Sequence, residues 1–519
     1  SLPPVARELV SQAMALAMRG DLEHAAQASL RAHVLAPGSG EVSTLASMIL
    51  LQLGRYREAR VLALHAAAQP ARPDDLFRIA RLLARFEEPE ALERLFLTSQ
   101  WRALDSVPAF AELAQLLGFA GLYDLAFECL AHAHALDPLA ADVHYLRGLF
   151  EMFSGRMAAS QASIRRAIEL EPRMASAHWL LSMQEKAETA GQHVEQIRRV
   201  MHAAESGSEA RACFDYCLHH SLHALGRHEE AWQALAHGHA VQRRLKRYSP
   251  EEQRALVESL ERMQLPIREP SPLREGRTGL IFIVGMFRSG TTLLERLLAG
   301  HPDVHDGGET TQFSASMRDA TDCDSDQPLS LEVALRAAGA DFAAVGARMQ
   351  RFADWRAQGK RWLTEKLPSN FLNIGFILLA LPEARILHMR RDPIDTCFSN
   401  LRTLFRGGAP YACDQRDLAD YYLLYRRLMR HWHAVAPGRI LDVDYAEFVA
   451  DPEAQAKRVM AYCGLEYVPN ALDAGSRKGM AATASAAHVR QGVLTNRGQA
   501  WKPYAAHLRP LLDGLAPAY

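Results

Sequence analysis

The chain has 519 residues, which is too long for one ordinary hydrophobic core and predicts two or three domains. Its 49% hydrophobic and 23% charged residues are typical of a globular protein, and the formal net charge of -1 gives no general attraction to nucleic acid or anionic lipid. Any basic binding site must therefore be local. No apolar run reaches the ~18 residues of a membrane-spanning helix, so we expect no membrane span.

The cysteines are few and odd in number, seven in all, unlike the paired pattern of a disulfide-stapled secreted domain. The first residues also lack a basic segment followed by an apolar one, so we expect a cytoplasmic protein. Cys213, Cys217, His219 and His220 lie close together in sequence. No distant second pair is present to complete a tetrahedral shell, so we expect ordinary helix residues and no metal site there.

The first half of the chain repeats with a period of about 34 residues. Glycines mark the units, and Phe86 or a neighbour stands where one marker is missing. The markers are Gly20, Gly54, Gly121, Gly155, Gly191 and Gly226. Small residues follow most of these positions after five residues, namely Ala25, Ala59, Ala91, Ala126, Ser160 and Ala231. The pattern predicts pairs of helices that pack closely across a glycine turn, and Pro138 and Pro172 predict pair boundaries because proline cannot continue a helix.

This pattern resembles the tetratricopeptide repeat family over roughly residues 5–245. The resemblance implies an all-α solenoid of stacked helix pairs whose concave face binds a peptide or a partner protein. An irregular helical domain with coincident glycines is the alternative. We assign residues 1–245 to the repeat domain.

The composition changes over residues 246–278. The capping pattern at Ser249 predicts the start of one more helix, and the prolines at 266, 270 and 272 predict a stiff linker. Beyond the linker, three short apolar runs separated by helical stretches predict buried parallel strands: Gly279–Val284, Arg385–Met389 and Arg439–Val443. Residues 279–519 are therefore expected to form an α/β domain with a mostly parallel sheet.

A glycine-containing turn follows the first of these strands directly. Its sequence is Gly285-Met286-Phe287-Arg288-Ser289-Gly290-Thr291-Thr292, and a helical pattern follows it. Such a turn directs backbone N–H groups and a helix N-terminus at one place, which favours phosphate or sulfate. The glycine spacing matches the loop of nucleotide triphosphatases, but Thr291 stands where those loops carry lysine and Arg288 supplies the cation instead. This argues against ATP or GTP hydrolysis and against a P-loop kinase.

Two further motifs carry charged residues. Arg391 follows the second predicted strand, and Ser399 lies eight residues later on the next predicted helix. An arginine can make two charge-assisted bonds to a phosphate, and a hydroxyl adds a neutral donor, although such a turn alone is more often a surface ion pair. Glu309 follows two glycines, and Lys366 precedes a Leu-Pro pair.

In this order the motifs resemble the sulfotransferase superfamily over residues 279 to about 510. The arginine version of the loop is similar to the tyrosylprotein sulfotransferases and to bacterial sulfotransferases fused to tetratricopeptide repeats. Phe287 departs from the proline common at that position. The resemblance implies 3′-phosphoadenosine 5′-phosphosulfate as the donor, no metal, and these nucleotide-binding residues: Arg288, Ser289, Gly290, Thr291 and Thr292 for the 5′ end, and Arg391 and Ser399 for the 3′-phosphate.

The resemblance also implies the catalytic residues. Glu309 is the expected general base for the acceptor hydroxyl, while Arg288 and Lys366 stabilise the leaving group. Lys366 stands where cytosolic small-molecule sulfotransferases place a histidine, which moves the base role to Glu309. His305 is the runner-up base.

A last segment near the C-terminus resembles the part of these families that closes over the nucleotide. Ser485 precedes Trp501 by 16 residues, as the phosphate-contacting serine of the families does. Ala500 replaces their usual lysine, so Arg490 or Arg497 is expected to substitute for it.

The function that follows is sulfuryl transfer to a hydroxyl, with a tyrosine of a peptide or protein, presented by the repeat domain, as the leading acceptor. Sulfation of a glycan or small molecule is the close alternative. A non-catalytic repeat adaptor is a third interpretation, against which the joint presence of Arg288, Glu309, Lys366, Arg391 and Ser399 speaks. No nucleic-acid partner is expected, and the residues do not predict an oligomeric state.

Overall fold

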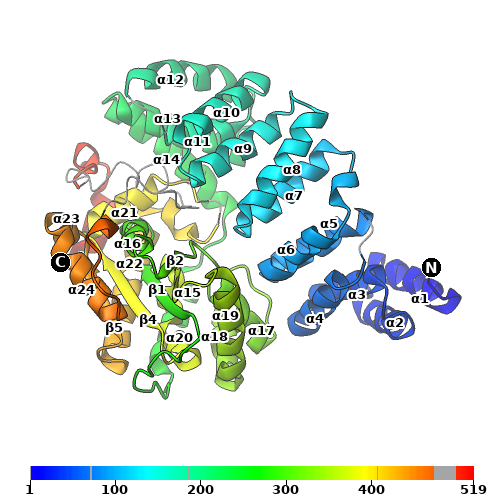
Figure 1. Cartoon of the computed structure of the whole chain (residues 1–519). Coiled ribbons are helices and arrows are strands. Elements are labelled where there is room, and N and C mark those ends of the chain that lie inside the picture. Colours follow the sequence, from blue (N-terminus) through cyan, green and yellow to red (C-terminus); the bar gives the residue numbers. More distant parts are fainter. Residues whose placement is uncertain (1, 71–72, 185–186, 406, 473–497) are drawn as a thin grey trace. The chain divides into compact units, whose positions relative to one another are not determined.

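The computed structural model describes residues 2–70, 73–184, 187–405, 407–472 and 498–519. The chain forms two compact units, which we describe separately. The first comprises Ser1–Leu146, Thr311–Asp326 and Leu335–Phe352, and the second comprises Arg147–Thr310, Gln327–Ala334 and Ala353–Tyr519. Figure 1 shows helices throughout the N-terminal half and the strands of a sheet in the C-terminal half. No described helix is long and apolar enough to cross a membrane.

Helices of the first half come in pairs joined by short turns, as the repeat predicts. Their bounds are α1 Pro4–Met18, α2 Leu22–Leu35, α3 Gly40–Gln52, α4 Tyr56–Ala67, α5 Pro73–Arg85, α6 Pro89–Thr98, α7 Val107–Phe119, α8 Tyr123–Leu136, α9 Ala141–Phe153, α10 Met157–Leu170, α11 Ala175–Ser182, α12 Ala187–Met201, α13 Glu209–Ala224 and α14 His228–Leu245. Helices α8 and α10 end just before Asp137-Pro138 and Glu171-Pro172, which confirms the predicted boundaries. Five of the marker glycines lie in the turns with φ between 73° and 81°, where an L side chain would be strained: Gly20, Gly54, Gly121, Gly155 and Gly226.

The prediction for the remaining marker glycine, Gly191, was wrong. Gly191 lies inside α12, so it is not a turn residue. Helix α11 has only eight residues and ends at Ser182, so the turn of this pair comes earlier than the period predicts. Between α5 and α6 the turn contains Glu87 with φ 53°, next to Phe86, where the sequence predicted that a non-glycine residue replaces the marker.

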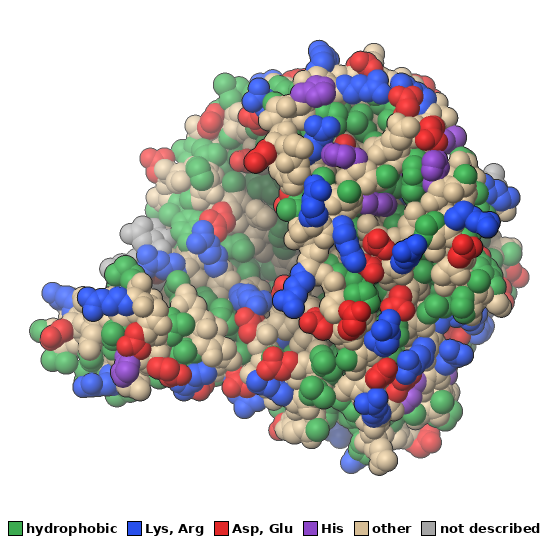
Figure 2. Space-filling view, turned by 180° about the vertical axis from the view of Figure 1, so that it is seen from behind, with side chains coloured by type: hydrophobic (Ala, Val, Ile, Leu, Met, Phe, Trp, Pro, Cys, Tyr) green, Lys and Arg blue, Asp and Glu red, His purple; other side chains and the backbone are tan. Residues whose placement is uncertain are grey.

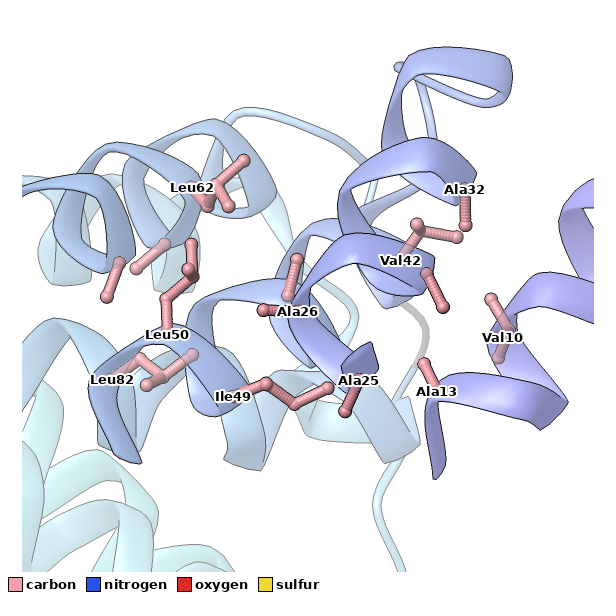
Figure 3. Close-up of a cluster of buried hydrophobic side chains, with 14 of the residues drawn as sticks. Val10, Ala13, Ala25, Ala26, Ala32, Val42, Ile49, Leu50, Leu62 and Leu82 are labelled. Carbon is pink, nitrogen blue, oxygen red and sulfur yellow. The ribbon is translucent and has the colours of Figure 1, made fainter. Parts of the chain in front are cut away.

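Small side chains let the helices of the first unit approach closely. Ala25 and Ala26 of α2 belong to a buried cluster that also includes Ala13 of α1 and Ile49 of α3 (Figure 3). Alanine exposes little backbone and leaves room for the neighbouring helix, so these positions serve packing rather than chemistry.

The same close approach occurs in the second unit, between α9 and α10. Ser160 Oγ donates a hydrogen bond to the Gly148 carbonyl at 2.7 Å. A Cβ at Gly148 would lie 2.7 Å from Ile164 Cγ1, closer than carbon atoms pack. Gly148 is therefore required by packing, although its φ is ordinary.

Two segments from the C-terminal half belong to the first unit. They contain α17 (Gln312–Thr321) and most of α19 (Phe342–Arg356). Arg348 is 7% exposed and donates to the Phe86 carbonyl at 2.7 Å and to Glu88 Oε1 at 2.9 Å. Gln312 Nε2 donates to the Glu87 carbonyl at 3.0 Å. The α5–α6 turn is thus bonded to residues more than two hundred positions later in the chain.

The sheet of the second unit has five parallel strands in the order β2-β3-β1-β4-β5. Their bounds are β1 Gly279–Gly285, β2 Val304–Asp306, β3 Trp362–Glu365, β4 Arg385–Arg390 and β5 Ile440–Asp444. Strands β1, β4 and β5 confirm the three predicted strands and the parallel sheet. The short strands β2 and β3 were not predicted.

The expected helix after Ser249 is also present as α15 (Pro250–Arg262), with the Ser249 hydroxyl accepting from the Glu252 N–H.

Helices cover both faces of the sheet. One face packs against α16 (Thr291–Ala299), α23 (Tyr445–Ala450) and α24 (Pro452–Cys463), through a cluster that includes Ile281, Leu297 and Met460. Helix α22 (Gln415–Val435) covers the other face, where Tyr425 bonds to His388 of β4. Both faces are buried, which explains why β1 is apolar along its whole length.

Repeat helices of the second unit cap the C-terminus of α21 (Pro393–Leu401), the helix that carries Ser399. His220 of α13 donates to the Arg402 carbonyl at 2.8 Å, and His239 of α14 donates to the Leu401 carbonyl at 2.9 Å. These carbonyls have no partner within the helix, so the two imidazoles satisfy them. Arg402 Nε in turn lies 2.9 Å from His219 Nε2.

The domain boundaries at residues 245 and 279 were assigned along the sequence, and they stay a prediction.

Candidate functional site

The predicted site residues follow three neighbouring strands. Because β1, β3 and β4 are parallel, their carboxyl ends lie at the same edge of the sheet. Arg288 comes three residues after β1, Lys366 comes directly after β3, and Arg391 comes directly after β4. Ligands of open α/β sheets bind outside this edge, so the fold directs the three cations to one binding region.

The turn after β1 has the backbone of an anion-binding loop. Arg288 has φ 69° and Gly290 has φ 108°, and α16 begins at Thr291. A side chain on Gly290 would meet the Tyr445 ring at 2.7 Å, so only glycine fits. A left-handed arginine is strained, and such strain is concentrated at functional sites. The loop thus directs its N–H groups and the first turn of α16 at one point.

Arg288, Ser399 and Arg391 are brought together. Arg288 Nε donates to Ser399 Oγ at 3.1 Å, and Arg391 Nη1 lies 3.4 Å from the Arg288 carbonyl. All three side chains are partly exposed, so a ligand can reach them. Two motifs about one hundred residues apart therefore form a single cationic cluster.

Two residues that the sequence analysis did not single out support this cluster. Arg391 lies over the ring of Tyr445 with its Cζ 4.6 Å from the centroid, a cation–π contact. Asn400 of α21 donates to the Phe287 carbonyl at 2.7 Å. The Phe287 ring packs against Phe405, with centroids 5.4 Å apart. The loop is thus held by a side-chain hydrogen bond and ring packing at the position where proline is common.

A second cluster lies at the end of β3. The Lys366 ammonium is fully buried and lies 2.6 Å from Glu309 Oε1 and 4.0 Å from Glu295 Oε2. The Glu309 side chain is 28% exposed, whereas that of Glu295 is 4% exposed. One cation therefore links a buried carboxylate to a solvent-accessible one.

The loop that carries Glu309 is fixed to β3 through its backbone. The Gly307 N–H donates to the Thr364 carbonyl at 3.1 Å, and the Lys366 N–H donates to the Gly308 carbonyl at 3.0 Å. A Cβ at Gly307 would lie 2.1 Å from the Thr364 oxygen, so no side chain fits there. Gly308 has φ 76°. The glycine pair thus lets the loop approach β3 and turn sharply before Glu309.

Glu295 of α16 joins these parts. Its Oε1 accepts from the Gly308 N–H at 3.1 Å and from Thr364 Oγ1 at 3.0 Å. Burial raises the pKa of Glu295 to about 7, and the nearby Lys366 ammonium opposes that rise. The carboxyl of Glu295 therefore changes its charge near neutral pH, inside the site.

Of the other predicted site residues, the structure describes one and leaves three outside its described part. His305 lies on β2, and burial lowers its pKa to about 4, with Arg356 and Lys360 adding to the effect. Ser485, Arg490 and Arg497 lie outside the described residues. The chain after them is anchored beside the site, because the Gln499 N–H donates to Asp395 Oδ1 of α21 at 2.7 Å.

Sequence reasoning missed Glu295 and Tyr445, as well as Asn400. Glu295 had a signal, since it is a charged residue between two leucine pairs of an apolar helical pattern, Leu293-Leu294 and Leu297-Leu298. No signal in the sequence marked Tyr445, apart from its place at the end of a predicted strand.

The residues present fit a nucleotide donor with anionic groups at both ends. Ser289 Oγ is buried in the loop and has no hydrogen-bond partner among the described residues, which a phosphate or sulfate oxygen would supply. Arg391 and Ser399 both contact Arg288 and are partly exposed, so they can also donate to an anionic group of a ligand.

Comparison with known proteins gives the class. Residues 281–469 match the model of the sulfotransferase family, and residues 141–174 match that of the tetratricopeptide repeat. The chain therefore carries a sulfotransferase-family domain together with a segment that matches the tetratricopeptide repeat, which confirms both resemblances.

Individual relatives are distant. An uncharacterized protein of Aquifex aeolicus is 25% identical over 357 residues, which cover 63% of this chain and 44% of that protein. Protein-tyrosine sulfotransferase 2 of Gallus gallus is 26% identical over 200 residues, covering 37% of this chain and 53% of that protein. Omega-hydroxy-beta-dihydromenaquinone-9 sulfotransferase Stf3 of Mycobacterium bovis is 29% identical over 108 residues, covering 19% and 28%. The chain spans about half the length of the first two relatives.

Proposed function

We propose that this protein transfers a sulfuryl group from 3′-phosphoadenosine 5′-phosphosulfate to an acceptor hydroxyl, with a tyrosine of a peptide or protein as the leading acceptor. The observation that carries the proposal is the cluster of Arg288, Ser399 and Arg391 beside the loop after β1. It offers an anion site at each end, as a doubly phosphorylated adenosine requires. The nearby Lys366–Glu309 pair supplies a cation and a carboxylate.

The loop residues Ser289, Gly290, Thr291 and Thr292 bind the 5′ end in this proposal. Their N–H groups and hydroxyls converge on one point, and the N-terminus of α16 adds its dipole. Arg391 and Ser399 bind the 3′-phosphate, because guanidinium groups form paired bonds to phosphate. Ser485 and Arg490 stay proposed contacts from the segment before Gln499.

The bound donor supplies an electrophilic sulfur and a phosphate leaving group. Glu309 accepts the proton of the acceptor hydroxyl as its oxygen bonds to sulfur and the bond from sulfur to the bridging phosphate oxygen breaks. Arg288 stabilises the charge that develops on that oxygen. Lys366 has three donors, of which Glu309 engages one, so the same ammonium can serve the leaving group. No residue in this scheme requires a metal ion.

Nucleotide binding is the first test. Calorimetry with adenosine 3′,5′-bisphosphate should show binding without metal, whereas ATP with Mg²⁺ should bind more weakly. Arg391→Gln should weaken the bisphosphate at least tenfold but change the affinity for adenosine 5′-monophosphate little, since that ligand lacks the 3′-phosphate. Equal losses for both nucleotides would reject the assignment of Arg391.

Turnover is the second test. Glu309→Gln should lower kcat by about 10²- to 10⁴-fold while the affinity for the bisphosphate stays near that of the wild type, because only the proton acceptor is lost. Glu466→Gln, at an exposed position, is the matched control. Unchanged turnover in Glu309→Gln would reject it as the base.

The acceptor requires its own experiment. Two of the relatives named above are, by their names, a protein-tyrosine sulfotransferase and an omega-hydroxy-beta-dihydromenaquinone-9 sulfotransferase, so both classes of acceptor are worth offering. Labelled donor presented with tyrosine peptides, sugars and phenols should give the highest kcat/KM for a tyrosine peptide. On the face in Figure 2, basic and acidic side chains are interspersed.

A further inference from the structure

A cluster of two histidines and an aspartate lies on the face of the sheet that α22 covers. His388 is on β4, Asp442 is its register partner on β5, and His433 is on α22. Asp442 Oδ1 lies 2.8 Å from His388 Nδ1 and 2.9 Å from His433 Nε2. The three ligand atoms all lie within 4.8 Å of one another. The transfer scheme proposed above uses none of these residues.

We propose that His388, His433 and Asp442 bind a divalent transition-metal ion, best matched by zinc. Two imidazoles and one carboxylate form a donor set that zinc accepts, with a water molecule as the fourth ligand. The side chains of His433 and Asp442 are 36% and 31% exposed, so an ion and its water can enter from solvent. His388 is 5% exposed and forms the inner side of the site.

The surrounding residues orient the ligands as metal sites require. The other ring nitrogen of His388 bonds to the Tyr425 hydroxyl, and Arg390 Nη1 lies 3.2 Å from Asp442 Oδ2. Metal-binding imidazoles and carboxylates commonly engage a second group with their remaining polar atom. Arg390 thus holds one carboxylate oxygen and leaves Oδ1 for the ion.

Tyr425 allows His388 to change tautomer. Without metal, the tyrosine hydroxyl donates to Nε2, and Nδ1–H donates to Asp442. With metal, Nε2–H donates to the hydroxyl, and the Nδ1 lone pair faces the ion. A hydroxyl can donate or accept, so the hydrogen bond between Tyr425 and His388 is kept in both states. Ligand atoms around a tetrahedral zinc lie about 3.3 Å apart at bond lengths near 2.0 Å, so the nitrogen–oxygen distances of 2.8 Å and 2.9 Å must each lengthen by about half an ångström for the ion to enter.

The ion would join β4, β5 and α22 immediately before Arg391. Strand β4 ends at Arg390, one residue before the arginine that contacts the Arg288 carbonyl. The ion is therefore expected to stabilise the strand end that carries Arg391, and it takes no part in sulfuryl transfer. Its test does not depend on the proposed activity.

The test is metal binding by the full chain, purified without a polyhistidine tag and treated with chelator. Calorimetry with Zn²⁺ should show one site that His433→Gln weakens at least a hundredfold, while His202→Gln, at an exposed histidine outside the cluster, leaves it unchanged. Zn²⁺ should raise the Tm of the wild type and not that of His433→Gln. Co²⁺ should give the intense visible absorption of a four-coordinate ion.

A second pair of variants keeps the test decisive. Asp442→Asn should also lose the site, and Tyr425→Phe should weaken it about tenfold because the hydroxyl that supports the ligand is gone. Circular dichroism checks that each variant is folded. The proposal is overturned if the wild type binds no Zn²⁺, or if His433→Gln binds it as tightly as the wild type.

Discussion

Replacing Glu295 with glutamine tests whether this buried carboxyl controls the stability of the sheet near neutral pH. Its pKa is raised from 4.5 to about 7 by burial. As pH rises from 4.5 to 7, the unfolded chain releases this proton while the folded chain keeps it, so folding loses stability over that range. Below 4.5 the stability is fully present, and above 7 the loss is complete.

The size of the effect follows from these two values. A difference between about 7 and 4.5, at ~1.36 kcal/mol per pH unit, corresponds to a loss of about 3 kcal/mol. Glu295→Gln removes the ionisation but keeps an oxygen that can accept from the Gly308 N–H and the Thr364 hydroxyl. The variant should therefore gain stability relative to the wild type as pH rises.

Hydrogen exchange of peptides from β1 and β3 measures local opening free energies and separates this unit from the rest of the chain. Measured from pH 5 to pH 8, the difference between variant and wild type should grow by about 2 to 3 kcal/mol in favour of the variant. Other buried acids act equally on both proteins and cancel. Parallel pH profiles for the two proteins would refute the reasoning.

Four further substitutions test the packing and the site. Gly148→Ala should destabilise the protein by about 1 to 3 kcal/mol, because the added Cβ would collide with Ile164. Gly191→Ala should stabilise the protein by about 0.5 to 1 kcal/mol, because no atom lies within 4 Å of the added Cβ. Thermal unfolding compares the two variants. Gly307→Ala should lower kcat at least tenfold, with a smaller effect on the bisphosphate Kd, because it displaces the loop before Glu309 from β3. Tyr445→Leu should weaken the bisphosphate about 3- to 10-fold in calorimetry, because Arg391 loses its cation–π contact.

The sequence determined the parts of the fold that rest on local patterns. The glycine turns set the helix pairs, because a left-handed backbone favours glycine at five of the six markers. The run at β1 is recognisable because a strand buried on both faces is apolar along its whole length, and β4 and β5 keep enough apolar residues around His388 and Asp442 to be recognised as well. The loop around Arg288 was likewise visible, because its spacing of glycine, cation and helix start is local.

Tertiary structure alone decided what depends on distant contacts. Strands β2 and β3 have three and four residues, too few for a pattern, and pairing with neighbours defines them. The Lys366–Glu309–Glu295 arrangement joins residues from two strand ends and a helix, so spacing could not reveal that one buried ammonium lies between two carboxylates. Gly191 belonged to the same periodic series as the turn glycines, and only the packing of a shortened α11 placed it inside a helix. Periodicity in the sequence determines which residues can form turns or be buried. Contacts between distant segments decide which charged groups lie next to one another.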